Sequence, residues 1–301
     1  MSTVQPSGDM PGDGAGSEPR GGPTALRMLL GAQLRRLREA ARVSPEDAGY
    51  EIRASRSKIS RLEHGRVGFK IRDVEDLLTL YGVTSESARK GLLALAQQAN
   101  KDGWWAQYGD VMPDWFEAYI GLEAAATLIR TFEVQFVPGL FQTESYARAV
   151  TRQGHQNDRP EDIERRVRLR MKRQDLLVAP DRPRVWSVMD EAALRRPVGG
   201  PDVMREQFQR LLEVARLRHV TLQVMPFSRG GHAAEGGSFS ILRFSEPDLP
   251  DVVYTEQLTG ALYLERRPDV DHYMEVMNRL SAEALPPPGT ARFLRRLVRE
   301  T

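Results

Sequence analysis

The sequence contains no cysteine, which excludes disulfides, thiolate metal sites and cysteine nucleophiles and is consistent with a reducing cytosol. It also lacks any uncharged apolar run near the roughly 18 residues that a membrane helix needs. No apolar signal core follows the first methionine. We therefore expect a cytoplasmic protein that has no membrane partner.

Signatures of metal binding and catalysis are equally scarce. The five histidines are scattered without ligand spacing, so no metal site is predicted. No serine lies in a G-x-S-x-G motif, and the glycine-rich segment 230–237 lacks the lysine and hydroxyl of a P-loop. Asp190 and Glu191 follow a predicted strand, where paired carboxylates could act as acid and base. The nearby Arg195 and Arg196 favour an ion-pair network, so we expect neither catalysis nor a cofactor.

The composition is that of a globular protein with more than one domain. Of the 301 residues, 41% are hydrophobic and 28% are charged, while the net charge is only +2. Residues 1–23 hold six glycines and four prolines but almost no bulky apolar side chain, which predicts a disordered tail. We predict a small helical domain over residues 24–100 and a larger α+β domain over residues 101–301.

Residues 24–100 carry the apolar spacing of five short helices. Serine N-caps, a proline at a first helical position and a closing glycine fit the second and third helices. The signals are the leucine stripe 26–37, Ser44 with Pro45, Ser55 with Gly65, and apolar stripes at 71–81 and 85–98. Together they predict a complete all-α domain.

The segment 44–65 has the pattern of two helices that cross at a tight turn. Ala48 and Gly49 are small where the helices should cross. Ile59 and Leu62 are expected to point inward, which leaves the outer face of the second helix polar and basic. A helix presented in this way fits the major groove of DNA.

Basic and hydroxyl side chains on that outer face are the predicted DNA contacts. Residues 53–72 hold seven basic side chains and one acidic one, a local charge of +6 that would neutralise phosphates. Arg56 and Arg61 could pair bidentately with guanine, whereas Arg66 and Lys70 are expected to contact phosphates. A solvated helix face is the alternative for such a charge run. The full predicted set is Ser55, Arg56, Ser57, Lys58, Ser60, Arg61, Arg66 and Lys70.

Several motifs resemble known families. Segments 31–38, 44–48 and 55–65 resemble the xenobiotic-response-element (XRE) family of helix-turn-helix regulators, which is related to lambda-type repressors. Segments 115–123, 137–148, 173–174 and 189–197 resemble the C-terminal domain, of unknown function, of actinobacterial regulators described as WhiJ-like or antitoxin-like. The resemblance extends over about residues 26–280. It implies a lambda-repressor-like five-helix DNA-binding domain, a small partner protein encoded nearby and no catalytic activity.

Two positions depart from the family pattern. Arg53 stands where the turn usually has a glycine, and that position often takes the left-handed conformation, which is costly for other residues. Pro45 stands where many relatives carry a glutamine that touches phosphate. Proline offers neither a side-chain donor nor an N–H, so this contact should be missing. The turn at Arg53 is expected to differ slightly from the family pattern, which leaves the exact docking register open.

The second half of the chain mixes helical and strand patterns in an order typical of α+β domains. The basic run 165–173 could be a second DNA contact, but a helix with Ile163 and Val167 inward and its arginines paired or solvated fits better. Segment 230–237 is expected to be a mobile loop that could cover a site. Helices are expected at 115–132, 143–152, 163–177, 203–216, 270–280 and 289–299, and strands of an antiparallel sheet at 185–189, 220–224, 239–244, 252–256 and 262–265.

Taken together, the sequence predicts a sequence-specific transcription regulator that binds double-stranded DNA as a homodimer. Domain 101–301 is larger than dimerisation requires, so we expect it to bind a small protein encoded nearby or a small-molecule effector. The alternative is an antitoxin-like protein that mainly holds a small partner and binds DNA for autoregulation. An enzyme is a third interpretation, disfavoured because the catalytic motifs are missing.

Overall fold

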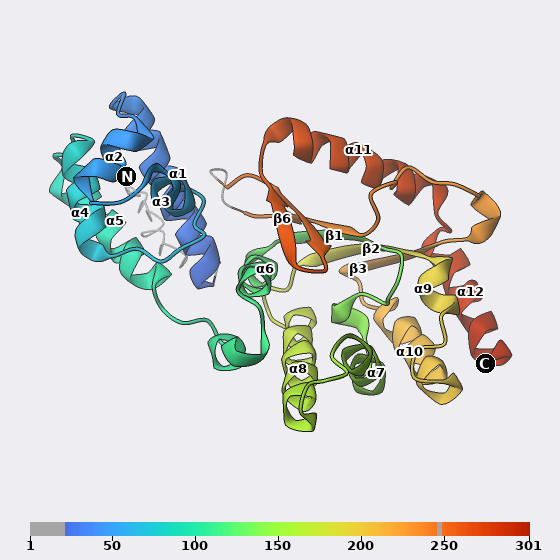
Figure 1. The fold of residues 1–301 in the computed structure, drawn as a ribbon. Coiled ribbons are helices and arrows are strands. Elements are labelled where there is room, and N and C mark those ends of the chain that lie inside the picture. The colour runs from blue at the N-terminus through green and yellow to red at the C-terminus, as the bar shows by residue number, and fades with distance from the viewer. Residues whose placement is uncertain (1–21, 246–248) are drawn as a thin grey trace, which may run out of the picture.

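The computed structural model describes residues 22–245 and 249–301, and it contains a helical N-terminal domain beside a larger α+β domain (Figure 1). Residues 1–21 of the predicted tail lie outside the described residues. Gly22 is the N-cap of the first helix, which begins at Pro23. No helix in the described ranges is long and apolar enough to cross a membrane.

Five helices form the N-terminal domain, as predicted. Serine side chains cap three of them: Ser44, Ser55 and Ser85 accept hydrogen bonds from the backbone N–H three residues further on, at 3.1, 3.2 and 3.4 Å. The helices are α1 (Pro23–Ala40), α2 (Pro45–Glu51), α3 (Arg56–Glu63), α4 (Ile71–Leu80) and α5 (Glu86–Ala99). Their core contains Leu30, Leu34, Ile59, Leu62 and Leu78.

The turns around α3 depend on backbone conformations that few residues adopt. Arg53 has a φ of +52°, so this position takes the left-handed conformation without a glycine. Gly65 has a φ of +62°, and a Cβ there would lie 2.5 Å from the backbone nitrogen of Met28 on α1. A Cβ at Gly49 would lie 2.7 Å from a backbone oxygen of the turn. The small residues therefore allow α2 and α3 to cross closely.

Arg53 provides a test of strain in the turn. Replacing Arg53 with glycine should stabilise the protein by about 0.5–1 kcal/mol, because relief of the left-handed strain outweighs the added freedom of the unfolded chain. Urea unfolding of the full-length protein measures the change. Arg53→Ala keeps the Cβ and is the control, so equal stability of the two variants would contradict this explanation.

The C-terminal domain is built from a six-stranded sheet and helices on both faces (Figure 1). Its helices are α6 (Asp114–Ala125), α7 (Glu144–Gly154), α8 (Pro160–Arg173), α9 (Glu191–Arg195), α10 (Pro201–Val214), α11 (Arg267–Glu283) and α12 (Pro287–Glu300). Its strands are β1 (Leu128–Glu133), β2 (Arg184–Asp190), β3 (Val220–Met225), β4 (Phe239–Arg243), β5 (Val252–Gln257) and β6 (Gly260–Leu264). Short 3-10 turns are η1 (Ala106–Val111), η2 (Gly139–Phe141), η3 (Gln174–Leu177) and η4 (Phe227–Arg229).

The sheet is mixed, with strand order β3-β2-β1-β4-β5-β6. The predicted antiparallel pairing holds for β4, β5 and β6. It is wrong for β2 and β3, because β1, β2 and β3 are parallel, and β1, which was not predicted as a strand, pairs antiparallel with β4. Helices connect the parallel strands, as parallel pairing requires. The predicted helix 115–132 is wrong at its end, because α6 stops at Ala125 and 128–133 form β1. This strand is buried on both faces, so it lacks the period-two alternation that would reveal it.

Helix α1 contributes to two cores. Its first turns pack Ala25 and Met28 into the core of the C-terminal domain, while Leu30 and Leu34 belong to the core of the N-terminal domain. The contact with α6 is close, because a Cβ at Gly121 would lie 1.9 Å from a side-chain oxygen of α1. One continuous helix therefore joins the two domains.

Candidate functional site

The outer face of α3 exposes most of the predicted DNA-contacting side chains. Arg56 forms an ion pair with Glu46 of α2 at 3.0 Å, yet its side chain is 73% exposed. An exposed pair of this kind is weak, so the guanidinium is available to a stronger partner. The Ser55 hydroxyl oxygen is used as the α3 cap but can still donate its hydrogen. The exposed members of the set on α3 and its N-cap are Ser55, Arg56, Ser57, Ser60 and Arg61.

The other predicted contacts occupy different places. Lys58 is half-buried and donates to Asp73 of α4 at 2.8 Å, so it holds α3 against α4. Lys70 is exposed and stands directly before α4. Arg66 is exposed and extends to the C-terminal domain. The structure therefore groups five of the eight predicted residues on the outer face of α3 and its N-cap. Lys58 points from α3 toward α4, and Arg66 and Lys70 lie beyond the end of α3.

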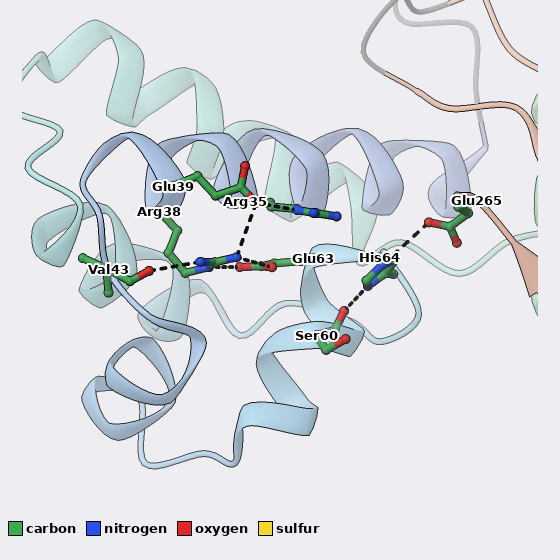
Figure 2. Close-up of polar contacts among 8 residues, drawn as sticks. All are labelled: Arg35, Arg38, Glu39, Val43, Ser60, Glu63, His64 and Glu265. Carbon is green, nitrogen blue, oxygen red and sulfur yellow. Dashed lines mark hydrogen bonds and ion pairs between the residues drawn. The ribbon is translucent and has the colours of Figure 1, made fainter. Parts of the chain in front are cut away.

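A buried ion pair between α1 and α3 escaped the sequence analysis. Arg38 is only 7% exposed and donates to Glu63 at 2.5 and 3.0 Å (Figure 2). It also donates to the Val43 carbonyl at 3.0 Å. The hydrogen bond to Glu63 raises the pKa of Arg38 despite its burial. Glu63, the one acidic residue among the basic residues 53–72, therefore anchors α3 to α1. A single acidic residue in a basic segment was the signal in the sequence that could have indicated this role.

Glu265 reaches the end of α3 from the C-terminal domain. Its carboxylate lies 3.4 Å from the Arg66 guanidinium. It also lies 3.9 Å from Nε2 of His64, and the Nδ1 atom of the same ring faces the Ser60 carbonyl at 2.6 Å (Figure 2). Arg66 also donates to the Tyr263 carbonyl at 3.4 Å. The side chain that we predicted to contact phosphate thus contacts the other domain in this structure.

A cavity of about 1040 Å³ lies in the C-terminal domain, on the face of the sheet opposite α11. Alternate residues of the central strands line its floor: Ile129, Thr131 and Glu133 of β1, Ser240 of β4 and Tyr254 of β5. Side chains of α6, η2 and α8 form its walls. The loop 230–237, expected to cover a site, does not line this cavity, because it follows β3 and packs against Phe132 on the other face.

A buried ion pair joins two walls of the cavity. Arg173 of α8 donates to both oxygens of Glu123 on α6, at 2.8 and 2.9 Å. Its guanidinium also lies over the rings of Phe116 and Tyr119, 5.0 and 5.5 Å from their centroids. Burial lowers the pKa of Arg173, and the Glu123 carboxylate more than reverses this, so the net pKa is raised. Arg173 is therefore charged and held between α6 and α8.

Two other charged groups in the cavity have neutral partners. Arg170 donates to the amide oxygen of Gln142 at 3.0 Å, and desolvation lowers the pKa of Arg170 to about 10. Burial raises the pKa of Glu133 to about 7, although a hydrogen bond with Ser238 opposes the shift. Within the described ranges neither side chain forms an ion pair within 4.0 Å.

The raised pKa of Glu133 has a consequence for stability. Between about pH 4.5 and 7 the folded state binds more protons than the unfolded state, so stability should fall as the pH rises. Glu133→Gln mimics the protonated form and should stabilise the protein at pH 8 by about 1–3 kcal/mol, with no gain below pH 4.5. Chemical unfolding across this pH range measures the difference in free energy of unfolding. Glu235→Gln on an exposed loop is the control. If the unmodified protein and both variants show the same dependence of stability on pH, the raised pKa of Glu133 is refuted.

The remaining sequence candidates have structural roles. In the basic run 165–173, Arg166 pairs with Asp158 at 3.0 Å and Arg165 pairs with Asp110, in agreement with the predicted paired helix. Asp190 caps α9 by accepting a hydrogen bond from the Ala192 N–H at 2.7 Å. Glu191 pairs with Arg195 at 3.0 Å, which is the part of the expected ion-pair network that forms. Asp190 lies 3.5 Å from His232, and Arg196 makes no ion pair with any described residue.

Comparison with family models assigns both domains. A helix-turn-helix domain model matches residues 29–90, which contain α3. The model described as Domain of unknown function (DUF5753) matches residues 116–296, more than half of the chain. The protein belongs to the DUF5753 family. The DUF5753 domain contains the whole floor of the cavity. Comparisons with curated proteins and with solved structures found no significant match.

Proposed function

We propose that the protein is a cytoplasmic, sequence-specific transcription regulator that inserts α3 into the major groove of its operator. The observation that carries this proposal is the exposed outer face of α3, where Arg56 and Arg61 stand free of strong partners within a helix-turn-helix domain. Arginine at such positions reads guanine bidentately. A homodimer would read two half-sites about one helical turn apart.

We further propose that the C-terminal domain controls DNA binding through α6. One side of this helix lines the cavity with Phe116, Tyr119 and Glu123, which recur at helical spacing. Its other side packs against α1 at Gly121. A ligand that alters the position of α6 therefore acts on the helix that carries the core of the N-terminal domain. Such control requires different ligand affinities in the DNA-competent and DNA-incompetent states.

A genome-wide binding map in the native cells tests the proposal. We expect the bound regions to share a motif of two half-sites, and we expect a variant with Arg56→Ala and Arg61→Ala to lose them. Arg168→Ala, on the exposed side of α8, is the matched control and should keep them. Bound regions without a shared motif, or an unchanged map for the double variant, would contradict sequence reading by α3.

The motif resemblance to WhiJ-like and antitoxin-like regulators supports a small partner protein encoded nearby. Purification of the tagged full-length protein from native cells tests for this partner. If the neighbouring protein co-purifies in stoichiometric amount and the binding map is confined to the protein's own promoter, the antitoxin-like function replaces the wider regulatory one.

A further inference from the structure

The cavity has the size and lining of a site for a small organic molecule. Pockets for such ligands usually measure about 300–1,000 Å³, and this cavity of about 1040 Å³ combines aromatic side chains with charged and amide groups. Its aromatic side chains come mainly from one wall and the floor. The aromatic residues that line the cavity are Trp115, Phe116 and Tyr119 of α6, Phe136, Phe141 of η2, Phe239 of β4 and Tyr254 of β5.

Arg170 differs from Arg166 and Arg173, the other arginines of α8 that line the cavity. Arg173 is neutralised by Glu123, and Arg166 pairs with Asp158. Within the described ranges the Arg170 side chain donates one hydrogen bond, to the neutral amide of Gln142, although a guanidinium carries five N–H donors. Glu256, which also lines the cavity, acts on Arg170 only beyond ion-pair distance. Because a desolvated cation without a close counter-charge is costly, the remaining donors favour an anion in the cavity.

The partner of Arg170 is itself fixed. Gln142 is 3% exposed, and its amide nitrogen donates to the Val137 carbonyl at 2.7 Å, which directs its oxygen toward Arg170. The guanidinium is therefore held in place before any ligand arrives, as a recognition group should be.

Glu133 limits the charge that the cavity can accept. It lies on the floor at the end of β1 and forms no ion pair with any described residue. A second anionic group on a ligand would meet this carboxylate, whose burial already disfavours its own charge. The cavity therefore favours a single negative charge, with the rest of the ligand apolar.

We propose that the cavity binds a small aromatic or alicyclic monocarboxylic acid, with its carboxylate on Arg170 and its ring against the aromatic wall of α6. Ligand binding does not depend on the proposed function. Only the expected consequence of binding, a change in operator affinity, rests on it. Binding itself is independent of DNA and is measured without it.

Calorimetric titration of the full-length protein with three probes of one shape tests the inference. We expect 2-naphthoate to bind saturably at one molecule per chain. The neutral 2-naphthamide and the dianionic naphthalene-2,6-dicarboxylate should each bind at least about tenfold more weakly, because one lacks the charge for Arg170 and the other adds a charge near Glu133. No saturable binding of 2-naphthoate, or equal affinity for 2-naphthamide, would overturn the proposal.

Two variants of α8 test whether Arg170 causes the preference for the charged probe. Arg170→Gln should remove the preference for 2-naphthoate over 2-naphthamide, whereas Arg168→Gln on the exposed face should keep it. Unchanged preference in Arg170→Gln would refute the role of Arg170, and the three-probe comparison on the unmodified protein stands even if this variant fails to fold. Operator affinity with saturating 2-naphthoate is measured separately. If it does not change, the proposed control of DNA binding fails while the binding site remains.

Discussion

Replacing Arg173 with methionine should lower the free energy of unfolding by about 3–5 kcal/mol, because the substitution leaves the Glu123 carboxylate buried without its partner. Arg173 and Glu123 are only 8% and 2% exposed, and they join α8 to α6 through two hydrogen bonds. The substitution also removes the cation that lies over Phe116 and Tyr119. Urea unfolding at pH 7 measures the loss of free energy of unfolding, with one common m-value fitted to both proteins.

A double variant separates the lost charge pair from lost packing. Arg173→Met combined with Glu123→Leu replaces the whole pair by apolar groups, which is often neutral or stabilising. We expect the double variant to recover most of the stability that the single variant loses. If both variants are equally unstable, the cavity walls depend on packing at these positions and the buried charge is not the cause.

Arg61→Ala should weaken binding to the operator by about 1–3 kcal/mol and relax specificity at one base position. Arg61 is exposed on the outer face of α3, where the helix would meet base edges. Lys70→Ala should instead weaken binding to all DNA sequences and flatten the dependence of log K on log salt by about one unit. Fluorescence anisotropy with operator and random duplexes over a salt series measures both effects.

The comparison between these two variants is the control. Equal losses on operator and random DNA for Arg61→Ala would remove this residue from the base-reading face. Arg66→Ala provides a third comparison, because Arg66 contacts Glu265 in this structure. Phosphate binding by Arg66 requires that this contact break, so Arg66→Ala should weaken DNA binding less than Lys70→Ala does.

Local signals explain what the sequence revealed about the fold. Helix caps at Ser44 and Ser55 depend on residues three positions away, and the structure has both hydrogen bonds. The left-handed turn at Arg53 was expected from the glycine that the resembling family has at this position, and the structure has it. The strands β4 to β6 follow each other through short connections, so their antiparallel pairing was readable from the chain.

Contacts between distant segments explain what the sequence did not reveal. Strand β1 lies in the sheet between β2 and β4, which begin about 50 and 110 residues further on. It is buried on both faces, and its pattern therefore merges with the helix before it. The pair of Arg38 and Glu63 and the cavity around Arg170 depend on packing of the same kind. The predicted reading face of α3 needed only helical geometry, which is why its exposure could be foreseen.

Helix α1 is a single rigid element that belongs to both domains. Its 18 residues span about 27 Å, with Ala25 and Met28 at one end fixed in one core and Leu34 fixed in the other. A tilt of about 5° at the α6 end would move the far end by about 2 Å, enough to displace a helix from its place on DNA. The shared helix also means that the domains should melt in one cooperative transition, since neither core is complete without it.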